Sequence, residues 1–197
     1  MALKEYGGFV NTALAFRSLL TSLVMPRIRV DVGQTGLFEG REFRLVRKIS
    51  VTAGTPLVVR FTSAVDFILS EQELNTTVGD IEFYAWRDTQ GTAGGTFSGV
   101  YTPIGKNISS AYRLYNGVRY ATQVAINYGG TFTPTNAEAY VDYDRAKTSG
   151  ATAQQTSVSG GDDSARYLAA GTYYLVFTSL DATSVGRFAL AWEERPT

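Results

Sequence analysis

From residue 27 onward, apolar and polar residues follow one another with the period of two that is typical of β-strands. Residues 27–32 alternate without a break. Further alternating or apolar runs cover residues 43–51, 57–61, 65–69, 81–86, 124–128 and 139–143. Arg47 interrupts the apolar parity of its run, which indicates either a bulge or a sheet edge. These runs predict half-buried strands, each with one face toward a core.

Two runs near the C-terminus, residues 173–178 and 187–193, alternate most clearly. Their apolar parity carries Tyr173, Leu175, Phe177, Phe188, Leu190 and Trp192. The turn-forming residues 181–184 separate the two runs. We therefore expect an antiparallel hairpin with one dry face.

The remaining segments are rich in turn formers. Residues 88–99 hold four glycines and predict a long loop, and residues 145–164 predict an exposed connection. We count about eight to ten strands and no alternation of strands with helices. The sequence thus predicts an all-β fold, an antiparallel two-sheet β-sandwich that is jelly-roll-like at this number of strands.

The first 26 residues have a different pattern. Gly7, Gly8 and Pro26 bound a stretch whose apolar residues recur at helical spacing. A short N-terminal helix or arm is expected there, which either covers the open end of the sandwich or docks on a neighbouring subunit. The residues expected to dock are Phe9, Phe16, Leu19, Leu20 and Leu23. We divide the chain into an N-terminal arm and first strand, residues 1–41, which makes assembly contacts, and a β-sandwich domain, residues 42–197.

Composition argues against catalysis. The 197 residues include neither cysteine nor histidine, so the usual neutral-pH acid–base group and the commonest zinc ligands are missing. We expect no enzyme activity, no catalytic residue, no cofactor and no metal. Eighteen basic and eighteen acidic residues cancel, which predicts no nucleic-acid partner. Arg17 lies in the middle of the most apolar segment, so no membrane partner is expected.

Two sets of side chains remain as candidate binding groups. Asp142 and Asp144 would share one strand face beside two tyrosines, which suits either a sugar or glycosidase site or a solvated face. Four tyrosines in the loop-rich middle present flat rings with polar tips, namely Tyr101, Tyr112, Tyr115 and Tyr120. They suit glycan or partner contacts, or plain packing over the end of the sandwich.

Four segments of residues 42–197 resemble β-rich virion structural proteins of tailed bacteriophages. They are residues 47–54, 61–67, 168–175 and 192–196. The resemblance implies a jelly-roll-like protein of the virion, such as a head decoration or cement protein or a tail-associated protein. Its partners would be copies of itself, with a homotrimer favoured, and major capsid or tail proteins. The alternative is a tail- or fibre-associated carbohydrate-binding module that recognises a receptor.

Overall fold

A computed structural model describes most of the chain from Thr35 onward, and these residues belong to one compact unit. The described residues are 35–106, 114–115, 118–149, 152–153, 155–159 and 166–196. The predicted docking residues Phe9, Phe16, Leu19, Leu20 and Leu23 and the predicted strand 27–32 lie outside them.

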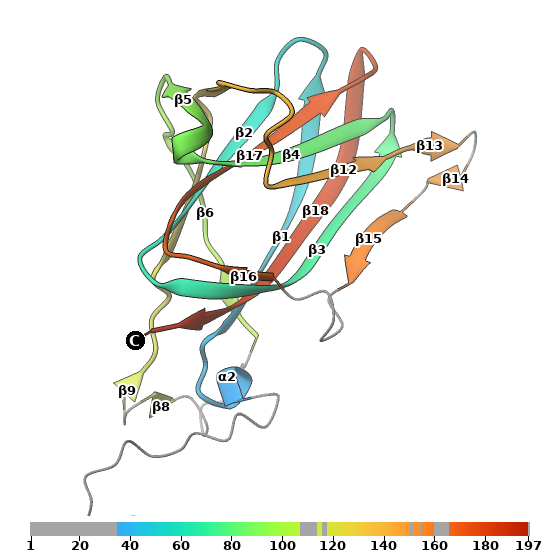
Figure 1. Cartoon of the computed structure of the whole chain (residues 1–197). Helices are drawn as coiled ribbons and strands as arrows, with labels where there is room; N and C mark the ends of the chain where they lie inside the picture. Colours follow the sequence, from blue (N-terminus) through green and yellow to red (C-terminus); the bar gives the residue numbers. More distant parts are fainter. Residues whose placement is uncertain are drawn as a thin grey trace, which may run out of the picture. The chain divides into compact units, whose positions relative to one another are not determined.

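Two antiparallel sheets pack face to face, which confirms the all-β sandwich (Figure 1). Sheet A has the order β15-β3-β18-β1-β7, and β16 also pairs with β3. Its strands are β15 (Gln155–Ser159), β3 (Asp66–Val78), β18 (Thr183–Arg195), β1 (Glu42–Thr52), β7 (Ile104–Gly105) and β16 (Arg166–Leu168). Sheet B has the order β12-β4-β17-β2-β10-β6. Its strands are β12 (Asp142–Ala146), β4 (Ile81–Arg87), β17 (Gly171–Ser179), β2 (Leu57–Ser63), β10 (Val124–Tyr128) and β6 (Gly99–Tyr101).

The connections between the sheets are those of a jelly roll. Sheet A contains the row β1-β18-β3-β15, and sheet B contains the row β2-β17-β4-β12. Followed along the chain, these eight strands alternate between the two sheets, except that β4 and β12 both lie in sheet B. The long β4–β12 connection carries the extra strands. It contains the turn η1 (Asp88–Gln90), the ribbon of β5 (Gly91–Gly94) and β11 (Thr131–Pro134), and the short pair β8 (Leu114–Tyr115) and β9 (Val118–Arg119). A second short pair, β13 (Thr148–Ser149) and β14 (Thr152–Ala153), follows β12.

The core lies between the sheets and is rich in aromatic rings. Trp192 is fully buried at its centre, edge-on to Phe61 at 5.3 Å and stacked with Phe43 at 6.0 Å between ring centroids. Such offset and edge contacts add to the free energy gained by burying these large side chains. The alternating residues of the sequence therefore meet in one continuous interior.

The predicted C-terminal hairpin is wrong. β17 pairs with β2 and β4 in sheet B, whereas β18 pairs with β1 and β3 in sheet A. The dry faces of the two strands meet across the core, where Phe177 and Phe188 lie 4.8 Å apart between centroids. An alternating pattern fixes which face is dry, and it does not distinguish a neighbour in the same sheet from one in the facing sheet.

Four further expectations need correction. Residues 145–164, expected as an exposed connection, include β15, which pairs with β3 in sheet A. β3 continues to Val78, where Glu73 pairs with Arg187 across the sheet and the polar residues Gln72 and Thr76 are buried. Residues 88–99 are not a plain loop, since β5 pairs there with β11. The strand expected at residues 139–143 begins at Asp142 instead.

Of the two alternatives for Arg47, the structure supports the sheet edge. The register of β1 with β18 is unbroken, which excludes a bulge. On its other side β1 pairs with β7 at Phe43 and Arg44, so Arg47 lies where β1 is an edge of sheet A.

A buried carboxylate fastens the end of the long insertion to the core. Glu194 is fully buried and accepts hydrogen bonds from Tyr120 Oη (2.9 Å), Thr122 Oγ1 (2.5 Å), the Gln123 backbone N–H (2.7 Å) and Trp192 Nε1 (3.2 Å). Four donors to one carboxylate replace the water that it loses on burial. Residues 120–123 are thereby held at the end of β18.

The residues just before β1 also contact the sandwich. Helix α2 (Thr35–Phe38) precedes Arg41, whose buried guanidinium donates to Glu193 (2.8 Å) and to the backbone oxygen of Glu194 (2.5 Å). These residues fall at the end of the predicted arm, residues 1–41. The division of the chain into an assembly arm and a sandwich stays a prediction.

Candidate functional site

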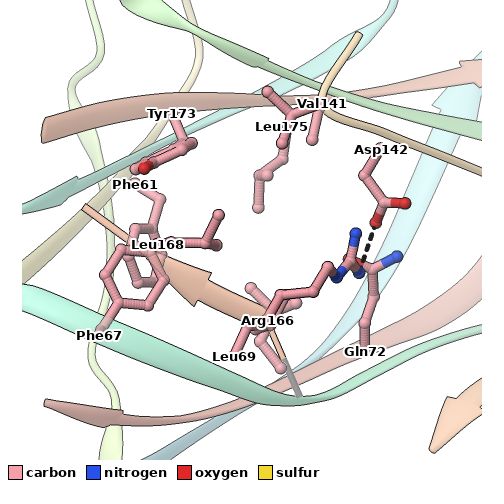
Figure 2. A pocket seen from close by; sticks show the side chains of 12 residues that line it. Phe61, Phe67, Leu69, Gln72, Val141, Asp142, Arg166, Leu168, Tyr173 and Leu175 are labelled. Carbon is pink, nitrogen blue, oxygen red and sulfur yellow. Dashed lines mark hydrogen bonds and ion pairs between the residues drawn. The ribbon is translucent and has the colours of Figure 1, made fainter. Parts of the chain in front are cut away.

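A small hollow opens between the sheets beside β16 and β12. Figure 2 shows apolar side chains around it, with the Arg166–Asp142 ion pair (2.8 Å) at one side. Its volume is about 40 Å³. This space accepts a few water molecules, whereas sites for small molecules start at roughly 300 Å³. The hollow is therefore a packing gap and not a ligand site.

The two aspartates singled out in the sequence face this interior. Asp142 is held by Arg166, and Asp144 is buried, which raises the pKa of its carboxyl mainly through loss of hydration. They share one face of β12, as expected for residues two apart on a strand. The space next to Asp142 is too small for a sugar ring, so this arrangement does not form a glycosidase cleft.

The outer face of sheet B is unusual because it is aromatic. Across the sheet, Val176 on β17 lies opposite Tyr84 on β4, and Tyr84 lies opposite Tyr143 on β12. One step along, Tyr174 lies opposite Trp86. The outer face of an antiparallel sheet is ordinarily polar and solvated. The aromatic composition of this face therefore differs from that of an ordinary solvated sheet face.

The β5–β11 ribbon covers one part of that face. Phe132 of the ribbon stacks on Tyr174 at 4.5 Å and lies 5.8 Å from Trp86 between ring centroids. Phe97 lies 5.9 Å from Tyr174 on the same side. Together these residues form a second apolar cluster outside the main core. The insertion between β4 and β12 is thus packed onto the sheet.

The uncovered part of the face forms an open hollow of about 310 Å³, which we call the aromatic surface. It is lined by Tyr84, Trp86, Pro134, Ala137, Glu138, Tyr140, Tyr143, Val176 and Thr178. Tyr84 lies 4.9 Å from Tyr143 and 5.7 Å from Tyr140 between centroids. Tyr140 and Tyr143 are 38% and 40% exposed, so their rings are available to a ligand.

Glu82 organises the polar edge of the aromatic surface. Tyr84 Oη donates to one of its carboxylate oxygens (3.2 Å) and Tyr143 Oη to the other (3.3 Å). Partial burial, with the Glu82 charge beside it, raises the pKa of Tyr84 to about 12 and shifts that of Tyr143 in the same direction. Arg145 lies 3.8 Å from Glu82 and 3.0 Å from Asp80, so two carboxylates balance its charge. Both phenols are consequently neutral hydroxyl groups at physiological pH.

A second exposed surface lies at the opposite side of the sandwich. Residues 99–106, which we call the β6–β7 crossing, pass from the edge of sheet B to the edge of sheet A. Val100 and Ile104 on it are 66% and 68% exposed. A groove of about 460 Å³ follows the crossing, and it is lined by Arg44, Leu45, Val46, Arg47, Thr102, Ile104, Gly105 and Lys106.

The loop tyrosines of the sequence analysis are placed differently from one another. Tyr101 turns inward from the crossing, stacks on Tyr128 at 4.3 Å and lies under the Arg47 guanidinium. Tyr120 packs on Phe43 and donates to Glu194. Both rings therefore serve internal packing. Tyr112 and the side chain of Tyr115 lie outside the described residues.

The sequence also carries a signal for the aromatic surface, in the apolar residues on both faces of β4. Tyr84 and Trp86 have the parity opposite to Ile81, Phe83 and Ala85, so β4 is apolar on both faces. A strand of that kind in an antiparallel sandwich must be covered or must bind a partner.

Comparisons with known proteins identify no relative. The chain matches no protein-family model and no curated protein. Within the described ranges, no three acidic side chains gather as a metal site would require. The same residues include no helix that is long and apolar enough to span a membrane.

Proposed function

We propose that this chain is a non-enzymatic structural protein of a tailed-bacteriophage virion, which forms homo-oligomers and docks on capsid or tail subunits. The resemblance of residues 42–197 to such proteins supports this, because its segments fall on β16 and on β1, β2, β3, β17 and β18, which are strands of the jelly roll.

The observation that carries the proposal is the β6–β7 crossing. It exposes Val100 and Ile104, and Ile104 lines a groove together with Arg44 and Lys106. The inward-pointing Arg47 on β1 protects that strand from edge-to-edge pairing. Neighbouring subunits would therefore meet through side chains at this surface and not by extending a sheet.

Charge substitutions at the crossing test the proposal. Replacing Val100 and Ile104 together by Asp should convert the wild-type oligomer into a monomer, measured as mass after gel filtration, and should abolish incorporation into particles assembled from the same genome. Val78→Asp is the matched control, because Val78 is 54% exposed at the end of β3. Unchanged mass and incorporation of the double variant would contradict the proposed surface.

Removal of the predicted arm tests its separate role. A chain without residues 1–26 should stay folded, as judged by thermal unfolding, and fail to enter particles. Normal incorporation of this chain would show that Phe9, Phe16, Leu19, Leu20 and Leu23 are not docking residues.

A further inference from the structure

We infer that the aromatic surface of sheet B is a binding site for a neutral oligosaccharide. The inference goes beyond assembly at the β6–β7 crossing and does not depend on it, because the two surfaces share no residue. It also moves the expected glycan contacts from the loop tyrosines to Tyr84, Tyr140 and Tyr143.

The rings provide what a pyranose needs. One face of a hexose is covered by C–H groups, which pack against the electron-rich face of an aromatic ring. Tyr140 and Tyr143 are 5.8 Å apart between centroids, and Tyr84 lies beside both. The three rings line the hollow at an angle to one another, and its volume of about 310 Å³ is that of a small-molecule site.

Polar groups at the edge suit hydroxyl groups and not an apolar partner. Glu82 accepts hydrogen bonds from the Tyr84 and Tyr143 hydroxyls, and the oxygens of these hydroxyls can in turn accept from a sugar. Thr178 lines the same hollow. An apolar protein surface would leave the remaining acceptor positions of these hydroxyls unused, at a cost in binding free energy.

The charge of the hollow selects among glycans. Glu138 is the one charged residue among the described residues that line it, and Glu82 lies at its edge. The nearest cation, Arg145, is balanced by Asp80 and Glu82. A sialylated or uronic-acid glycan would be repelled, whereas the hydroxyls of a neutral sugar would donate to the carboxylates.

A glycan array tests the site directly. Full-length protein is applied to neutral oligosaccharides of glucose, galactose, mannose and N-acetylglucosamine, with sialylated and uronic-acid glycans alongside. We expect binding to a neutral member, weakened roughly tenfold by Tyr140→Ala and by Tyr143→Ala. Tyr167→Ala is the matched control, because Tyr167 is a 64% exposed tyrosine on β16 in the other sheet. Its affinity should equal that of the wild type.

Tryptophan fluorescence gives a second readout in solution. The chain has two tryptophans, of which Trp86 lines the hollow and Trp192 is buried in the core. Titration with the array-positive oligosaccharide should change the emission, and Trp86→Phe should remove that change.

Three results would overturn the inference. One is the absence of binding to every neutral glycan at millimolar concentration, and another is a preference for the anionic glycans. The third is dissociation of the wild-type oligomer by Tyr140→Ala or Tyr143→Ala, which would make the surface a contact between copies of the chain. The Val100 and Ile104 variants should bind the glycan normally, so failure of one proposal leaves the other testable.

Discussion

The outer faces of the two sheets differ in chemistry although the sheets pack on the same core. The outer face of sheet A is charged, with Arg187 paired to Glu73 (2.5 Å) and Arg44 to Glu71 (3.5 Å). The outer face of sheet B carries Tyr84, Trp86, Tyr143, Tyr174 and Val176 in adjoining positions. One face is thus built to remain in water, and the other is built to be covered.

The charged face of sheet A and the aromatic face of sheet B differ in what exposure to water costs them. Exposed ion pairs contribute little to stability because water and salt screen them. Burying an aromatic side chain releases more free energy than forming an exposed ion pair. A group of exposed aromatic side chains is therefore typical of a surface that is covered or that binds a partner. On sheet B the β5–β11 ribbon covers Tyr174 and Trp86, while Tyr140 and Tyr143 stay open.

We expect the largest loss of stability at Trp86, which the β5–β11 ribbon covers. Trp86→Ala removes a buried indole from the outer cluster and should lower the free energy of unfolding by about 4 kcal/mol. Arg44→Ala removes a partly exposed ion pair with Glu71 on the outer face of sheet A and should cost less than about 1 kcal/mol. Urea unfolding of both variants measures the difference. Equal losses would mean that the ribbon adds no packing to sheet B.

Charge on sheet A should matter mainly where it is buried. Glu194→Ala leaves four donors in the interior without an acceptor and should lower the free energy of unfolding by about 3 kcal/mol. Chemical denaturation measures this loss, and Glu138→Ala, at an exposed carboxylate, is the control. A loss below about 1 kcal/mol would show that Glu194 does not hold residues 120–123.

Double-mutant cycles compare one pair from each face. The Glu71–Arg44 coupling should be at most about 1 kcal/mol and should fall at high salt. The Phe132–Tyr174 stack should give a coupling of similar size that salt does not reduce. Unfolding free energies in low and high salt supply both values. If salt weakened the aromatic coupling equally, the contrast between the faces would not hold.

The sequence was sufficient to predict the faces of the strands but not their partners. Alternation identified β1, β2, β4 and β10 because burial of one face imposes a period of two. It could not assign β17 and β18 to different sheets, since both arrangements bury the same residues. The burial of Glu194 could not be predicted, because it depends on donors more than 70 residues away in the sequence.

The aromatic surface was only partly visible in the sequence for a related reason. Tyr140 and Tyr143 stood out beside Asp142 and Asp144, which suggested a sugar site. The surface also needs Tyr84 from β4 and Val176 from β17, and these meet only through sheet pairing. The aspartates turn inward, whereas Tyr143 between them lies on the outer face of sheet B opposite Tyr84.

The smallest effect concerns the ionisation of Tyr84. Its pKa is about 12 instead of 10, because partial burial and the nearby Glu82 carboxylate disfavour the phenolate. The neutral phenol therefore stabilises the fold fully below pH 10, and this contribution disappears as the pH rises toward 12. The difference in ultraviolet phenolate absorbance between wild type and Tyr84→Phe should titrate near pH 12. A difference that titrates near pH 10 would show that Tyr84 is solvated, and the aromatic surface would then lack the partly dry wall that the glycan proposal requires.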